Sequence, residues 1–222
     1  MVALMAGALI GLQGINTLTA AESKAGWELL FDGKTTEGWA NFKATSKALR
    51  PGWKVQGGEL QVVDPDNAGD LVTNRSFKEF ELSIDYKVWP GSNSGIMFHV
   101  GNKDDFPWMT GPEVQILDNP AFPGAQKAGW LYELYSADKD TTKPAGQWNT
   151  VTMMISKKES WVKMNGELYY SFQYQGDDFI RRVKASKFGS MPNFAQAGEG
   201  AFGLQGDHGK VAFRNIKVRE IK

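Results

Sequence analysis

Apolar and polar residues alternate along most of the chain beyond its first two dozen positions. The longest run covers residues 80–88, where nine residues alternate without interruption. A period of two is typical of a β-strand with one buried face and one solvated face. Shorter runs of the same kind lie at 59–63, 96–100, 113–117, 131–135, 149–155, 161–164, 168–172, 201–205 and 211–218. The pattern predicts a chain built mainly from strands.

Turn-forming residues separate these runs. Asn165-Gly166 lies between the runs at 161–164 and 168–172, and Gly57-Gly58 lies between a further short strand at 53–55 and the run at 59–63. Both pairs favour the tight turn of a two-residue β-hairpin. The run at 211–218 changes phase between Phe213 and Ile216, which predicts a β-bulge. Many short strands with glycine-rich turns are typical of a sandwich or jelly roll.

One segment has a helical pattern instead. Asp177 and Asp178 are good capping residues for a short helix that carries Phe179, Ile180 and Val183 on one side. The 222 residues suffice for one sizeable core. We therefore predict an all-β fold, a jelly-roll β-sandwich of two antiparallel sheets with one short helix.

The N-terminal region differs from the rest of the chain. Residues 1–15 carry no charge and are almost wholly apolar or glycine, and small residues follow at Thr19-Ala20-Ala21. This pattern predicts a secretory signal peptide at 1–21 and a mature domain at 22–222, located in the periplasm or secreted. A membrane anchor and a disordered leader are the alternatives, although the run is shorter than the ~20 residues of a spanning helix. No other stretch predicts a membrane partner.

Charge and cysteine content exclude several classes of function. The chain has 25 basic and 25 acidic residues and no basic stripe, so a nucleic-acid partner is not expected. It contains no cysteine, which excludes disulfides and thiolate zinc sites. The oligomeric state does not follow from the sequence.

Several short motifs occur in a fixed order along the chain. They are Leu30-Phe31-Asp32-Gly33-Lys34 with Gly38-Trp39, Trp53-Lys54-Val55, Gly69-Asp70-Leu71-Val72-Thr73, Phe80-Glu81-Leu82, Asn93-Ser94-Gly95-Ile96, Glu113-Val114-Gln115-Ile116-Leu117-Asp118, Lys143-Pro144-Ala145-Gly146-Gln147-Trp148-Asn149, Asn165-Gly166, Gly203-Leu204-Gln205 with Asp207-His208-Gly209, and Phe213-Arg214-Asn215-Ile216. From about Trp27 to the C-terminus, this order resembles the 3-keto-disaccharide hydrolase family. The resemblance implies a concanavalin-A-like jelly roll that acts on sugars oxidised at carbon 3. Some members of that family are lyases rather than net hydrolases.

The run at 113–118 carries the strongest candidate residues. Alternation places Val114 and Ile116 on the core face, so Glu113 and Gln115 point outward. The resemblance makes that outward face the concave, sugar-binding side of the sheet. An ordinary solvated face is the alternative. We predict Glu113 as a catalytic base and Gln115 as a substrate-binding residue.

Further candidates lie in turns next to strands. His208 follows the run at 201–205 and is a suitable acid, base or ligand, with Asp207 and Gln205 as neighbouring substrate-binding residues. A histidine that simply bonds to its neighbour Asp207 is the alternative. Asn93 lies at the start of a strand, where its amide could bind a sugar hydroxyl or serve only the turn.

Four aromatic residues and one histidine complete the candidate set. His99 is expected to point outward on the same surface as Glu113 and to bind substrate, because Ile96, Phe98 and Val100 occupy the core positions of its strand. Flat aromatic rings suit pyranose surfaces. The predicted stacking residues are Trp130 and Tyr132, with Trp108 and Tyr135 as further candidates.

The candidate residues favour one reaction over ordinary glycoside hydrolysis. A glycosidase needs two carboxylates about 5–10 Å apart, and alternation places only Glu113 on the site face, with Asp118 opposite. A ketone at carbon 3 would instead let one base remove the carbon-2 proton, after which the aglycone leaves. We therefore predict a 3-keto-glycoside hydrolase or lyase with Glu113 as base and His208 as acid.

Two other kinds of protein and one cofactor stay open at this point. The same fold also hosts non-catalytic carbohydrate-binding modules and scaffolding domains. No cofactor is predicted from a motif. A divalent metal held by Glu113, His99 and His208 is possible by residue type, but no spacing pattern indicates it.

Overall fold

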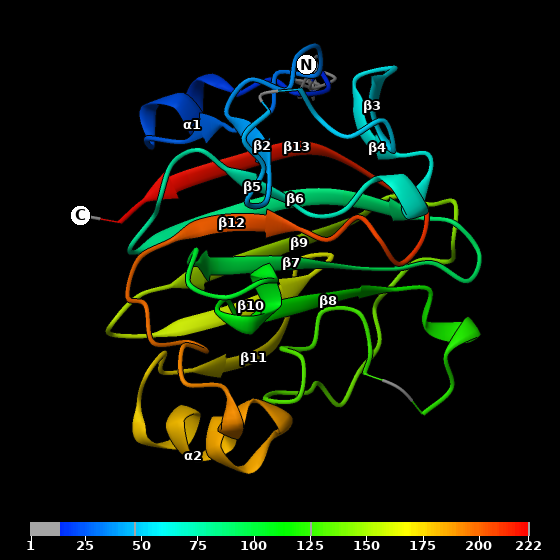
Figure 1. Ribbon diagram of the computed structural model, residues 1–222. Helices are drawn as coiled ribbons and strands as arrows, with labels where there is room; N and C mark the ends of the chain where they lie inside the picture. Colours follow the sequence, from blue (N-terminus) through cyan, green and yellow to red (C-terminus); the bar gives the residue numbers. More distant parts are fainter. Residues whose placement is uncertain (1–13, 47, 125, 222) are drawn as a thin grey trace, which may run out of the picture.

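The computed structural model describes residues 14–46, 48–124 and 126–221, and it consists of two antiparallel β-sheets packed face to face (Figure 1). The larger sheet contains β1 (Glu28–Leu29), β3 (Trp53–Gln56), β4 (Glu59–Val62), β6 (Phe80–Val88), β9 (Asn149–Ile155), β10 (Ser160–Met164), β11 (Glu167–Phe172) and β13 (Val211–Glu220). The smaller sheet contains β2 (Trp39–Asn41), β5 (Leu71–Thr73), β7 (Asn93–Val100), β8 (Glu113–Leu117) and β12 (Ala201–Leu204). The predicted all-β sandwich is confirmed.

The strand order places β8 at an edge of the smaller sheet. That sheet has the order β2-β5-β12-β7-β8, and the larger sheet has the order β11-β10-β9-β6-β13-β4-β3, with β1 paired to β13. Helices lie outside the two sheets. They are α1 (Ala20–Lys24) and α2 (Asp177–Ala185), with 3-10 turns η1 (Pro65–Asn67), η2 (Pro107–Met109), η3 (Asn119–Ala121) and η4 (Lys187–Ser190). The predicted short helix is α2.

Aromatic side chains join the two sheets in the core. Phe80 on β6 contacts Phe202 on β12 edge-on, with 4.7 Å between ring centroids, and Phe98 on β7 at 6.3 Å. The core positions of β6 alternate strictly with half-buried polar ones, as the sequence pattern predicts. Burying each large apolar side chain contributes roughly 1.5–3 kcal/mol, so this inter-sheet layer holds the smaller sheet in place beneath the site.

The predicted turns are confirmed. Asn165 and Gly166 have φ angles of 51° and 85°, and Gly57 and Gly58 have 62° and 79°. Two consecutive positive φ angles define the expected hairpin turn. Asn215 on β13 also has a positive φ, 49°, at the point where the register of β13 with β6 shifts. This shift is the predicted bulge.

The predicted strand at 131–135 is wrong. The segment is a tight turn in which the Leu131 amide donates to the Tyr135 carbonyl at 2.9 Å, and Glu133 has a φ of 64°. Only the two ends of the segment form β-bridges, Leu131 with Val114 and Leu131 with Tyr135. The turn therefore lies along the free edge of β8, next to Glu113.

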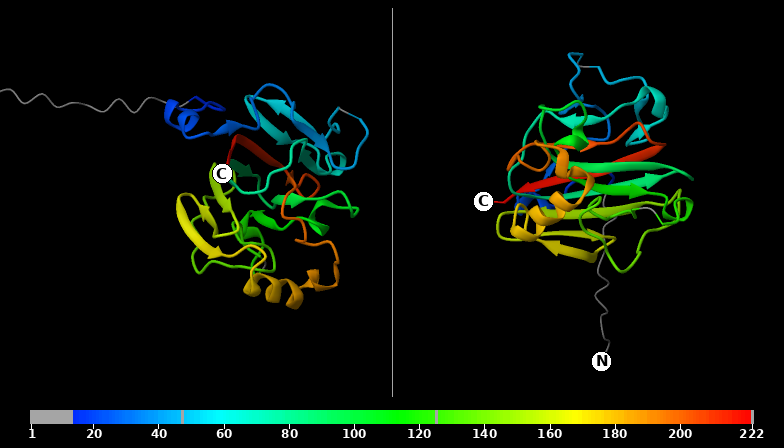
Figure 2. Two further views of the ribbon diagram at one scale, coloured as in Figure 1. Left: turned by 90° about the vertical axis from the view of Figure 1, so that its left-hand side faces the viewer. Right: turned by 60° about the horizontal axis from the view of Figure 1, so that its bottom comes forward.

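The two α-helices lie at opposite ends of the sandwich (Figures 1 and 2). Glu22 of α1 forms an ion pair with Lys217 on β13, with 2.8 Å between Oε1 and Nζ. Part of the predicted signal peptide, residues 1–13, lies outside the described residues, and the predicted cleavage after Ala21 falls within α1. Its removal and the periplasmic or secreted location stay predictions. Among the described residues, none of the helices is long and apolar enough to span a membrane.

Candidate active site

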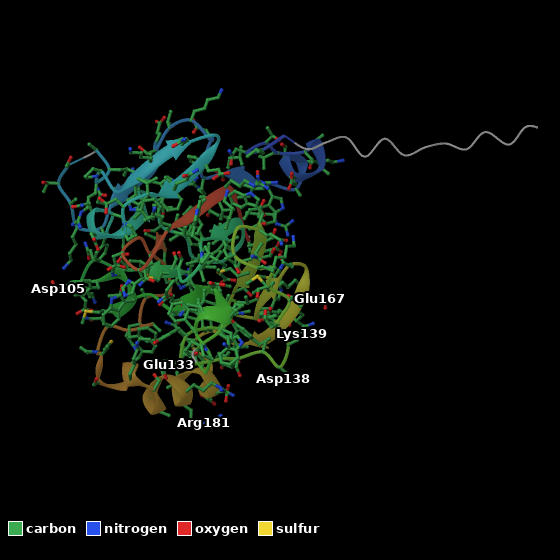
Figure 3. All side chains as sticks on the ribbon, turned by 90° about the vertical axis from the view of Figure 1, so that its right-hand side faces the viewer. Asp105, Glu133, Asp138, Lys139, Glu167 and Arg181 are labelled. Carbon is green, nitrogen blue, oxygen red and sulfur yellow. The ribbon has the colours of Figure 1, made fainter. Side chains whose placement is uncertain are left out.

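A cavity of about 660 Å³ opens on the outer face of the smaller sheet, at the ends of β7 and β8. This volume lies within the ~300–1,000 Å³ range of small-molecule sites. Its polar lining includes Asn93, Glu113, Gln115, Gln205, Asp207 and His208, and its aromatic lining is Phe106, Trp108, Phe122, Tyr132 and Phe188. In Figure 3, Glu133 of the lining is labelled between Asp105 and Arg181 of α2. Seven of the nine predicted site residues therefore line one cavity.

Glu113 is the half-buried carboxyl of this cavity. Its side chain lies directly over Gly95 of the neighbouring strand, so closely that a Cβ atom at Gly95 would overlap Oε1 and stand 2.5 Å from Cδ. Burial raises the pKa of Glu113 to about 7, although the positive charges of Lys187 and His208 oppose that rise. A carboxyl with this pKa can accept and release a proton near neutral pH.

Gln115 holds the Glu113 carboxyl in place. The orientation of an amide is assigned from its neighbours, and the orientation that makes hydrogen bonds turns its nitrogen toward Glu113. Nε2 then donates to Glu113 Oε1 at 3.1 Å, to the Ser94 carbonyl at 2.9 Å and to Asn93 Oδ1 at 3.3 Å. Gln115 thus contacts the candidate base itself.

His208 and Asp207 form a hydrogen-bonded pair at the rim of the cavity. Nδ1 of His208 lies 2.5 Å from Oδ1 of Asp207, and about half of the His208 side chain is exposed. This hydrogen bond raises the pKa of His208 above its usual value and lowers that of Asp207. The backbone N–H of Asn93 donates a hydrogen bond to the backbone carbonyl of His208 at 3.1 Å. The raised pKa favours the protonated imidazole, which can act as an acid. The turn that carries His208 is hydrogen-bonded to β7 through Asn93.

Asp70, which has no predicted role from the sequence, carries a carboxyl group next to the cavity. Burial and the nearby Asp207 raise its pKa to about 6. Its Oδ1 accepts a hydrogen bond from the Gly206 amide at 3.2 Å, which supports the turn that carries His208. The motif at 69–73 marked this position, but strand alternation could not place it beside a turn more than a hundred residues later.

His99 is not in the cavity, and the prediction that it points outward is wrong. Its φ of 52° interrupts the alternation of β7, so the ring enters the core, where it is 1% exposed and packs among Phe80, Phe98 and Tyr174. Its Nε2 donates to the Lys78 carbonyl at 2.9 Å. Burial lowers the pKa of His99 to about 4, so the ring is neutral and cannot bind substrate in this position.

The metal hypothesis loses its ligand set with His99. Glu113 and His208 share the cavity with each other but not with His99. Among residues 14–46, 48–124 and 126–221, there is no group of three or more His, Asp or Glu side chains that could hold a metal ion. The combination of Glu113, His99 and His208, which residue type alone left open, does not come together as one site.

The predicted aromatic residues separate into cavity and core. Tyr132 lines the cavity, as does Trp108, whose ring stacks on the half-exposed Phe106 at a centroid distance of 5.8 Å. Trp130 does not line the cavity. Its side chain packs against the core, and its backbone carbonyl accepts a hydrogen bond from the backbone N–H of Gln115 at 2.9 Å. Tyr135 stacks on core rings of the larger sheet. Trp130 therefore contributes through its backbone only.

Lys187 is a cavity residue that sequence analysis missed. It lies in η4, directly after α2, and its Nζ stands 4.3 Å from the centroid of the Tyr132 ring. No strand periodicity covers this segment, so the sequence carries no signal that brings it to β8. Lys187 follows α2 in the chain, so the position of α2 in the fold brings it to the cavity.

Comparison with known proteins agrees with this architecture. The 3-keto-alpha-glucoside-1,2-lyase-like domain family matches residues 26–219. A curated relative from Bacteroides thetaiotaomicron, named 3-keto-disaccharide hydrolase, is 31% identical over 88% of this chain and 79% of its own length.

Solved structures extend the likeness. A crystal structure from Parabacteroides distasonis, described as a putative glycosyl hydrolase, is 29% identical, with a TM-score of 0.86 over 94% of this chain and 100% of that one. The β-glucanase of Bacillus licheniformis shares the fold alone, at 12% identity, with a TM-score of 0.50 over 88% of this chain and 97% of its own. The chain belongs to the 3-keto-alpha-glucoside-1,2-lyase-like domain family, the family of 3-keto-disaccharide hydrolase.

Proposed function

We propose that this protein cleaves glycosides whose sugar ring carries a ketone at carbon 3, and that Glu113 starts the reaction by removing the proton on carbon 2. One observation carries the proposal: a half-buried carboxyl with a pKa of about 7 shares a cavity with the His208–Asp207 pair. The family membership and the named relative from Bacteroides thetaiotaomicron support the substrate class.

The chemistry needs one base and one acid. The ketone makes the carbon-2 proton acidic, so Glu113 takes this proton, and the electron pair of the C–H bond forms an enolate with the oxygen on carbon 3. The enolate then expels the aglycone oxygen from carbon 1, and protonated His208 supplies the proton to that oxygen. Release of the unsaturated sugar makes the enzyme a lyase, whereas addition of water to carbon 1 makes the net reaction a hydrolysis.

The raised pKa of Glu113 suits the first step. A base is most effective when its pKa lies near the working pH, because it is then both deprotonated and basic enough. A solvated glutamate with a pKa near 4.5 would be a far weaker base. Gln115 keeps the carboxylate oriented, and Asn93, Gln205 and Tyr132 are among the side chains of the lining that can contact the sugar.

The test compares a 3-keto-disaccharide with its unoxidised parent, using purified protein and chromatographic detection of the released sugar. We expect cleavage of the oxidised sugar only. Glu113→Gln is expected to lower the rate by ~10²–10⁴-fold, the usual contribution of a positioned base. Glu37→Gln, an exposed position outside the cavity, is the matched control.

Three outcomes would contradict the proposal. Equal cleavage of the unoxidised parent would remove the role of the ketone. Full activity of Glu113→Gln would remove the base. Saturable binding of the oxidised sugar without any cleavage by the unmodified protein would identify a carbohydrate-binding module instead.

A further inference from the structure

Glu113 lies between two walls of the cavity that come from opposite sides of β8. On one side, β7 and then β12 contribute Asn93 and the turn that carries His208 (Figure 1). On the other side, the free edge of β8 is covered by the turn at 131–135, whose Tyr132 amide donates to the Glu113 carbonyl at 2.9 Å. The candidate acid therefore stands on one side of the base, and the Tyr132 wall stands on the other.

Lys187 belongs to the Tyr132 wall. Its Nζ lies 4.3 Å from the ring centroid of Tyr132, 5.2 Å from that of Phe188 and 5.7 Å from that of Trp108. The next residue, Phe188, is 3% exposed and stacks on Phe194 at 3.8 Å, which anchors the turn. The lysine itself is exposed at the rim, and no carboxylate of the described residues lies within ion-pair distance of it.

The two walls thus present two cations to one carboxyl. The charge of Lys187 is the strongest of the nearby charges that act on Glu113, and together with His208 it favours the ionised carboxylate. The negative charges of Asp70 and Asp207 act in the opposite sense. Both acidic residues lie on the side of His208, so Lys187 is the cation of the cavity wall that has no neighbouring carboxylate of its own among the described residues.

The reaction needs this arrangement. Carbon 2, from which the base takes the proton, lies between carbon 1, which carries the leaving oxygen, and carbon 3, which carries the ketone. Elimination therefore needs a proton donor on one side of the base and a positive charge for the developing enolate oxygen on the other. A positive charge beside an oxygen that gains negative charge as the carbon-2 proton leaves is a large contribution to catalysis.

We propose that Lys187 is a catalytic residue whose ammonium group stabilises the enolate oxygen on carbon 3, with the aglycone directed toward His208. The inference rests on the proposed function. As Glu113 takes the carbon-2 proton, the C–H electron pair forms the C2=C3 bond and the carbonyl pair moves to the carbon-3 oxygen beside Lys187. The pair then returns as the C3=O bond re-forms, the C1=C2 bond forms and the C1–O bond breaks, and His208 protonates the leaving oxygen.

The experiment measures kcat, KM and their pH dependence on a 3-keto-disaccharide for Lys187→Met and Lys187→Arg. Lys184→Met on α2 is the matched control, because Lys184 is exposed and does not line the cavity. We expect Lys187→Met to lower kcat ~10²–10³-fold with little change in KM, and Lys187→Arg to keep most of the activity. In Lys187→Met the acidic limb of the pH profile should move to higher pH, because the charge that lowers the pKa of Glu113 is gone.

The outcomes separate this inference from the function on which it rests. If the unmodified protein cleaves no 3-keto-glycoside, the proposed function fails and the inference fails with it. If it does cleave, but Lys187→Met matches it in kcat or differs in KM alone, only the inference is overturned. Borohydride trapping of the substrate as a covalent adduct on Lys187 would also overturn it, because an imine and not a charge would then activate the ketone.

Discussion

Replacing Gly95 with alanine should disable the candidate base without changing any group that performs chemistry. Gly95 lies on β7 directly beneath the Glu113 side chain. An added methyl group would overlap Oε1 and stand 2.5 Å from Cδ and 2.6 Å from Cγ of Glu113. Contacts this short do not occur between non-bonded atoms, so the carboxylate would have to move by about 1 Å or more and lose its 3.1 Å bond to Gln115.

The expected loss is large in activity and small in stability. A displacement of about 1 Å costs ~10² in rate when the displaced group must meet a reacting atom. The overpacked methyl group costs about 1–3 kcal/mol of folding free energy, since the strand conformation at Gly95 suits any residue. The assay is kcat on a 3-keto-disaccharide together with thermal unfolding, and Gly198→Ala, where an added Cβ meets nothing within 4 Å, is the control.

A second variant distinguishes displacement of the Glu113 carboxylate from a general loss of folding. Adding Glu113→Asp to Gly95→Ala withdraws the carboxylate by one methylene group and should return part of the stability lost in the single variant. Activity of Gly95→Ala equal to that of Gly198→Ala would show that the position of the Glu113 carboxylate over Gly95 is not needed for the reaction.

Three further predictions concern pH. In Asp207→Asn, the hydrogen bond that raises the pKa of His208 is weakened, so the alkaline limb of the kcat/KM profile should move to lower pH; an unmoved limb would show that another group is the acid. The pKa of Glu113 is about 7 in the folded chain against 4.5 for a freely solvated side chain, so the folded state binds more protons and loses stability as the pH rises from 4.5 to 7. Glu113→Gln should therefore be more stable by about 1–3 kcal/mol at pH 8 and not at pH 4 in denaturant unfolding; a destabilised variant at pH 8 would show that burial does not destabilise the ionised carboxyl. The pKa of His99 is about 4 when folded against 6.5, so stability is lost as the pH falls from 6.5 toward 4, by about 3 kcal/mol; His99→Asn, which tolerates the positive φ, should flatten that acid dependence, and an unchanged slope would place its cause elsewhere.

Strand alternation was sufficient to predict much of the site. Glu113 and Gln115 line the cavity because Val114 and Ile116, which alternate with them along the strand, are fully buried, and this alternation is visible in the sequence. Turn chemistry predicted the hairpin at Asn165, since two positive φ angles need asparagine or glycine. Strand alternation and turn conformation depend on a few neighbouring residues, and therefore they can be predicted from the sequence alone.

The failures share a different origin. In the sequence, His99 occupies an outward position of the alternating strand pattern. In the structure, its positive φ turns the ring into the core, and the identity of the residue does not predict this change of backbone conformation. Lys187 lines the cavity, and Asp70 lies beside its rim residue Asp207, through the packing of elements distant in sequence. Contacts that depend on the sheet order and on where α2 docks are long-range, so a periodic pattern in one segment cannot show them.

Removal of the carbon-2 proton of a 3-keto sugar by Glu113 can be observed without following cleavage. Incubation with a 3-keto-disaccharide in D₂O, followed by NMR of the carbon-2 position, tests it most directly. We expect rapid loss of the carbon-2 proton signal with the unmodified protein and none above the buffer rate with Glu113→Gln, while the unoxidised parent keeps its proton in both. Loss of that proton at the same rate with Glu113→Gln would show that Glu113 is not the base.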